Sequence, residues 1–147
     1  MERKLSPEEQ ERIRLLSDGE IYQRAIEFAK EQEEIIAYRQ FGHQVSGLEA
    51  YARSFKELDE FVNHQKGRNW EEKSQSFEGF YTALANYLNN LREDVQGKYS
   101  FVPPEGQTKN EKKEQTDFFA GLLAREFVQH LAAEMMWQAW KSKKEGK

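Results

Sequence analysis

The sequence contains no cysteine and only three prolines and three histidines. Without cysteine, disulfide bonds, thiolate metal sites and a cysteine nucleophile are excluded, which fits a reducing compartment. No run of about 18 apolar residues and no secretory signal pattern occurs, so neither a membrane span nor export is predicted. We therefore expect a cytoplasmic protein with no membrane association.

Hydrophobic residues are few, since they make up 37% of the 147 positions, while charged residues make up 33%. Aromatic residues reach 13%, and ten of them are Phe. Since large rings supply much apolar area per residue, we expect an aromatic core. The length suffices for one domain with a single core, so we predict one domain over residues 1–147.

The net charge is −4, but residues 97–147 carry nine Lys and Arg against seven Asp and Glu. An acidic chain is unsuited to broad duplex binding, which needs many cations against phosphates. The basic end, about 141–147, is compatible with a local contact to nucleic acid. The alternative interpretation of this end is a solvated basic tail.

Helical signals recur along the chain. Ser6, Pro7 and Glu9 form a capping pattern that predicts a helix from 7 to about 16. Ser17 and Glu20 repeat the pattern, which predicts a second helix from 21 to about 41 with Gly42 as its stop. Apolar spacings of three and four predict a third helix from about 46 to Gly67 and a fourth, capped by Asn69, that closes at Gly97. Residues 97–115 show no periodicity and contain Pro103 and Pro104, so we predict a flexible loop.

The last predicted helix runs from about 116 to about 143 and is apolar on nearly every side. Such a helix must be enclosed, either by its own chain or by another molecule. No strand-like alternation of useful length competes with the helices. The predicted fold class is therefore all-α, a four- to five-helix bundle with a long, largely apolar C-terminal helix.

The stretch "REFVQH", Arg125 to His130, resembles the motif of the HEPN superfamily of small helical ribonucleases, in which an arginine is followed by four to six residues and a histidine. The resemblance implies metal-independent RNA cleavage across a dimer interface. Arg125 would stabilise the developing phosphate charge and His130 would transfer a proton. Because residues five apart lie about 140° apart on a regular helix, convergence of the two needs a long reach or a distorted turn.

Two similar pairs suggest a metal site as another hypothesis. Glu60 and His64 lie at i and i+4, as do Glu126 and His130. This spacing places both side chains of a pair on one helical face, where they can chelate zinc or iron. The periodicity of the third predicted helix turns Glu60 and His64 toward solvent, so we expect no metal and no other cofactor.

The end of the last helix combines apolar and basic side chains in a mixture suited to partner binding. The predicted partner-binding residues are Met136, Trp137, Trp140, Lys141, Lys143 and Lys144. With its "MWQAWKSKK" stretch and helical make-up, the chain resembles the small helical subunits of type III CRISPR effector complexes, which implies stacking in a ribonucleoprotein filament without catalysis. We expect a non-catalytic interaction subunit that docks on a partner protein or ribonucleoprotein complex, or self-associates. The HEPN-like ribonuclease is the alternative.

Overall fold

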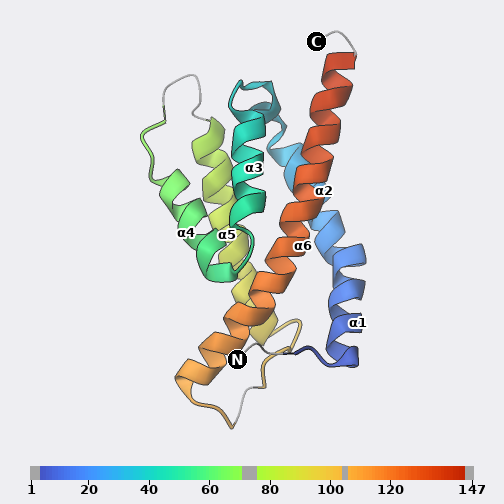
Figure 1. The fold of residues 1–147 in the computed structure, drawn as a ribbon, viewed down its shortest axis with the longest axis vertical. Coiled ribbons are helices and arrows are strands. Elements are labelled where there is room, and N and C mark those ends of the chain that lie inside the picture. The colour runs from blue at the N-terminus through green and yellow to red at the C-terminus, as the bar shows by residue number, and fades with distance from the viewer. Residues whose placement is uncertain (1–3, 71–75, 104–105, 145–147) are drawn as a thin grey trace.

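A computed structural model describes residues 4–70, 76–103 and 106–144, and most of these residues lie in helices (Figure 1). No β-strand occurs in this described part, so the predicted all-α class is confirmed. The elements in chain order are α1 (Pro7–Leu16), the π-helix η1 (Ser17–Ile21), α2 (Tyr22–Glu31), the 3₁₀ helix η2 (Glu33–Ala37), α3 (Phe41–Tyr51), α4 (Phe55–Lys66), α5 (Ser76–Gln96) and α6 (Lys109–Lys144).

The first capping pattern forms as predicted, but the second does not. Glu9 N–H donates to Ser6 Oγ at 3.1 Å, and Ser6 N–H donates to Glu9 Oε1 at 2.9 Å. Ser17 keeps helical dihedral angles, with φ −61° and ψ −43°, so α1 continues through η1 into α2 without a break. The predicted cap at Ser17 is wrong, because Ser17 lies within this continuous helix and its side chain contacts Glu126 and His130 of α6.

The predicted helix from 21 to 41 ends early, at Glu31. Gln32 leaves the helical region, with φ −112° and ψ 21°, and the residues after it form the 3₁₀ helix η2. This turn buries Ile35 against the bundle, where η2 packs on α3, α5 and α6. Gly42 lies inside α3 and stops no helix, so that prediction is wrong.

The third predicted helix is two helices, α3 and α4. Ser54 caps α4 by accepting a hydrogen bond from Glu57 N–H at 3.2 Å, which opens a new helix in the middle of the apolar stripe. Gly67 ends α4 as predicted. The predicted cap of the next helix by Asn69 is wrong, because Trp70, the residue after it, is not helical, and α5 is described from Ser76 on.

The last helix is longer than predicted, since α6 begins at Lys109 rather than near Thr116. Thr108 and Glu111 form a capping box, in which Glu111 N–H donates to Thr108 Oγ1 at 3.1 Å and Thr108 N–H donates to Glu111 Oε1 at 3.3 Å. The prediction of a loop over 97–115 is therefore wrong for 109–115. Before it, Phe101 is buried and stacks on Phe119, with ring centroids 4.6 Å apart.

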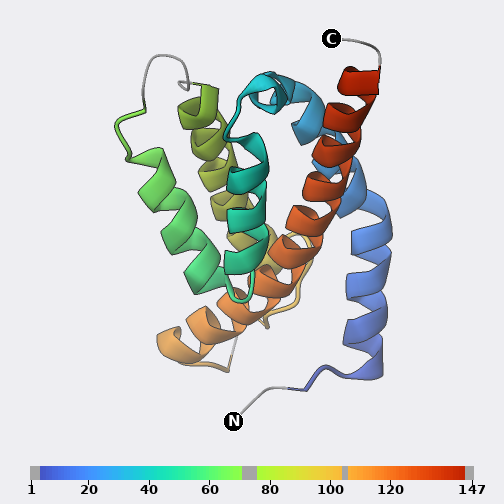
Figure 2. The same cartoon turned by 45° about the horizontal axis from the view of Figure 1, so that its top comes forward.

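Helix α6 crosses the whole bundle, with α3, α4 and α5 on one side and α1 on the other (Figure 1 and Figure 2). It packs against α2, α3, α4, α5, η1 and η2. Its buried positions are Thr116, Phe119, Ala120, Leu123, Ala124, Phe127, Val128, Leu131, Ala132 and Met135. The chain itself thus covers most apolar side chains of α6 up to Met135, while Arg125, Gln129 and Ala133 on the same helix are exposed.

Candidate functional site

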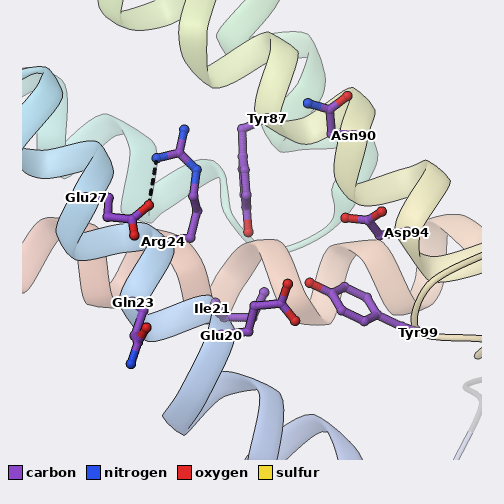
Figure 3. A pocket seen from close by; sticks show the side chains of 9 residues that line it. All are labelled: Glu20, Ile21, Gln23, Arg24, Glu27, Tyr87, Asn90, Asp94 and Tyr99. Atoms are coloured by element: carbon purple, nitrogen blue, oxygen red, sulfur yellow. Dashed lines mark ion pairs between the residues drawn. The ribbon is translucent and has the colours of Figure 1, made fainter.

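Two surfaces of the bundle combine exposed side chains with a hollow. One is at the C-terminal end of α6. The other lies between α2 and α5 (Figure 3).

Met135 is the last buried residue of α6. Met135 is 0% exposed, whereas Met136, Trp137 and Trp140 are 50%, 53% and 50% exposed. The two tryptophan rings stack on each other, with centroids 5.1 Å apart and an interplanar angle of 24°. We call Met136, Trp137, Trp140, Lys141, Lys143 and Lys144 the C-terminal patch. All of its residues, the predicted partner-binding set, lie on the final turns of α6.

Beside the C-terminal patch, a groove of about 640 Å³ separates α6 from the end of α2 and η2. Its lining residues are Lys30, Glu33, Ile36, Glu134, Trp137, Gln138, Lys141 and Ser142. Gln138 Oε1 is buried and has no hydrogen-bond partner among the described residues. The groove therefore offers an aromatic wall, a free acceptor and lysines on both sides.

The structure does not bring Arg125 and His130 together. Arg125 is exposed and lines a small hollow with Ser54 and Phe55, at the start of α4. His130 faces η1 and α2, where its Nε2 lies 3.1 Å from Ser17 Oγ and its ring meets Tyr22 edge-on. A joint role in RNA cleavage would require the two side chains to meet across two copies of the chain.

The two Glu–His pairs of the metal hypothesis also stay apart. Glu60 and His64 are exposed on α4, while Glu126 Oε1 and His130 both contact Ser17 Oγ, at 2.9 and 3.1 Å. Within the described ranges, no group of three or more His, Asp or Glu side chains is placed to hold a metal ion. Because Ser17 is only 4% exposed, this cluster serves to fasten η1 to α6.

The second surface is a pocket of about 370 Å³ that sequence reasoning missed. We call it the α2–α5 pocket. Its walls come from η1 and α2, from α5, and from the segment after α5, and its lining residues are Glu20, Ile21, Gln23, Arg24, Glu27, Tyr87, Asn90, Asp94 and Tyr99 (Figure 3). These two stretches of chain are distant in sequence and carry no known motif, so no local signal marks the pocket.

Carboxylates dominate the charge of the α2–α5 pocket. Arg24, its one arginine, is 3.8 Å from Glu27 and 3.1 Å from Glu31, outside the lining. Glu20 forms an ion pair with Lys98. Burial raises the pKa of Asp94, and the neighbouring Glu20 and Glu93 add to the rise while Lys98 opposes it. Burial is therefore the main reason that the negative charge of Asp94 is disfavoured.

The two tyrosines of the pocket share this environment. Burial raises the pKa of Tyr99, and so do Glu20 and Asp94. Burial also raises the pKa of Tyr87, whose hydroxyl oxygen is buried and has no hydrogen-bond partner among the described residues. Figure 3 shows both hydroxyl groups directed toward the space between α5 and η1.

Replacing Tyr87 by phenylalanine is expected to raise the free energy of unfolding by about 1 kcal/mol, because a buried hydroxyl without a partner is removed. The matched control is Tyr81→Phe. The Tyr81 hydroxyl donates to Gln44 Oε1 at 2.5 Å, and both residues are buried, so its loss should lower stability. Urea denaturation followed by circular dichroism measures the free energy of unfolding of both variants. Changes in the same direction would contradict the absence of a partner for the Tyr87 hydroxyl among the described residues.

Comparisons with protein-family models, curated proteins and solved structures found no match to this chain. Among the helices that the structure describes, none combines the length and apolar character required to cross a membrane.

Proposed function

We propose that this protein is a non-catalytic helical interaction subunit that docks on a partner protein through the C-terminal patch. The observation that carries the proposal is the exposure of about half of Trp137 and Trp140, whereas the third tryptophan, Trp70, is 8% exposed. Tryptophan is highly buried on average and is enriched among the residues that dominate binding energy at interfaces. Two stacked tryptophans in solvent are suited to burial under another protein.

The charges around the C-terminal patch indicate the chemistry of the partner. Lys141, Lys143 and Lys144 occupy the last turn of α6, and Lys30 lies across the groove. The groove contributes two opposing charges, Glu33 and Glu134. Because lysines outnumber glutamates, charge complementarity favours a partner segment that carries acidic side chains beside an apolar anchor. The anchor would pack on the tryptophan rings, and the acidic groups would pair with the lysines.

Photo-crosslinking in the native host tests the proposal. A benzoylphenylalanine placed at position 140 should form an adduct with one protein, whereas the same group at position 15 should not. Leu15 is a fair control because it is 57% exposed but lies on α1, away from the patch. With purified partner, Trp137→Ala/Trp140→Ala should weaken binding by at least about tenfold, and Leu15→Ala should leave it unchanged.

Other occupants of the C-terminal patch give different results. An adduct between two copies of the chain, matched by a dimer in sedimentation velocity, would replace the proposal with self-association. An adduct that disappears after ribonuclease treatment would show that RNA holds the complex. Absence of any adduct at position 140 would reject docking through this end of α6.

A further inference from the structure

We propose that the α2–α5 pocket binds a small organic cation that carries an ammonium or guanidinium group. This inference is independent of the docking proposal, since none of the pocket residues belongs to the C-terminal patch. The volume of about 370 Å³ falls within the range of about 300–1,000 Å³ that is typical of small-molecule sites.

The sign of the ligand charge follows from the groups that face the pocket. Glu20, Glu27 and Asp94 supply three carboxylates against the guanidinium of Arg24. Arg24 is already held by Glu27 and Glu31, and Lys98 pairs with Glu20 from the rim. Asp94 forms no ion pair within the described ranges. A bound cation would offset this negative charge, whereas an anion would add to the repulsion.

A second observation, separate from the carboxylates, also points to a ligand. The Tyr87 side chain is partly buried, and its hydroxyl oxygen is buried with no hydrogen-bond partner among the described residues. In Figure 3 this hydroxyl is directed into the space between α5 and η1. A hydroxyl oxygen accepts hydrogen bonds, and an ammonium or guanidinium group offers only donors. The ligand class that suits Asp94 therefore also suits Tyr87.

The rings around the pocket are held by contacts with other groups of the chain. Lys98 Nζ lies 5.7 Å from the centroid of the Tyr99 ring, so an ammonium group already occupies the face of this ring at the rim. Tyr87 is held in place by stacking on Phe127, with centroids 4.0 Å apart. The π-helix η1 supplies Glu20 and Ile21 to the wall, and π-helical turns are frequent at functional sites.

Three probes of equal carbon-chain length separate the charge requirement from shape. They are 1,4-diaminobutane, the neutral 1,4-butanediol and the dianion succinate. In nuclear magnetic resonance titrations of the ¹⁵N-labelled protein, only the diamine should shift the amide signals of Glu20, Asp94 and Tyr99. Butylguanidinium, the other cationic probe, should shift the same signals.

Variants connect the binding to named atoms. Asp94→Asn should weaken binding of the diamine by about tenfold or more, and Glu49→Gln, which removes an exposed carboxylate on α3, should not change it. Tyr87→Phe removes only the hydroxyl oxygen and should also weaken binding while the protein stays folded. Reduced binding with undiminished stability is a result that a purely structural role of Tyr87 would not produce.

Several outcomes would overturn the inference. One is that neither cationic probe binds at millimolar concentration. Another is that succinate or butanediol shifts the same signals as strongly as the diamine does. A third is that Asp94→Asn and Tyr87→Phe both bind the diamine as the unmodified protein does, which would place the cation elsewhere on this acidic chain.

Discussion

Replacing Phe127 by alanine is expected to lower the free energy of unfolding by about 3–5 kcal/mol. Phe127 is 0% exposed and lies where α6 meets α2 and α5. Its ring meets Phe28 edge-on at 5.6 Å and stacks on Tyr87 at 4.0 Å. Since a domain is stabilised by about 5–15 kcal/mol in total, this loss is a large fraction of the stability.

Urea denaturation followed by circular dichroism measures the loss, and Trp140→Ala is the matched control on the same helix. Trp140 is 50% exposed and its main aromatic contact is Trp137, so its truncation should cost less than about 1.5 kcal/mol, the upper range for an aromatic pair. Similar losses of stability for the two variants would mean that Phe127 contributes no more to the core than Trp140 does. The control also establishes that a docking variant stays folded.

Replacing Gly121 by leucine is expected to cost about 3 kcal/mol, because α6 and the start of α4 approach closely at this position. A Cβ atom at Gly121 would lie 3.0 Å from the backbone nitrogen of Phe55 and 3.5 Å from its Cβ. Backbone atoms cannot move aside as a flexible side chain can, so the two helices would have to separate. The gain of about 1 kcal/mol in helix propensity on replacing glycine does not offset that separation.

Gly79→Leu serves as the control, since a Cβ there would meet nothing within 4 Å and the residue is exposed on α5. Leucine at this position should leave stability unchanged or raise it by up to about 1 kcal/mol. The two thermal unfolding midpoints should therefore move in opposite directions or differ by several degrees. Equal destabilisation would show that the α4–α6 contact at Gly121 is looser than described.

Local sequence patterns predicted the helices best where the side chains satisfied their own backbone. The Ser6 and Glu9 pair formed its capping box, and Gly67 ended α4. The same kind of pattern at Thr108 and Glu111 also formed, although the surrounding lysines and polar residues made the segment look like a loop. At Ser17 the pattern failed because Glu126 and His130 of α6 compete for the serine hydroxyl.

The two candidate sites also differ in how far the sequence indicated them. Trp137 and Trp140 stood out in the sequence, because large apolar rings lie directly beside lysines there, and both are about half exposed. The α2–α5 pocket did not stand out, because Glu20 and Arg24 are brought to Tyr87 and Asp94 only by the packing of distant segments. Periodicity describes one helix at a time and holds no information about which faces of two helices meet.

The sequence by itself determined the helical class, several helix ends and the apolar character of α6, because each depends on neighbours within one or two turns. Only the tertiary structure decided where the helix from 21 to 41 breaks, on which side of α6 Arg125 and His130 lie, and which turn of α6 leaves the core. Those outcomes depend on burying side chains such as Ile35, Phe127 and Met135 against partners far away in the chain. Burial free energy of that kind exceeds the small differences in local helix propensity, so packing overrides the local pattern.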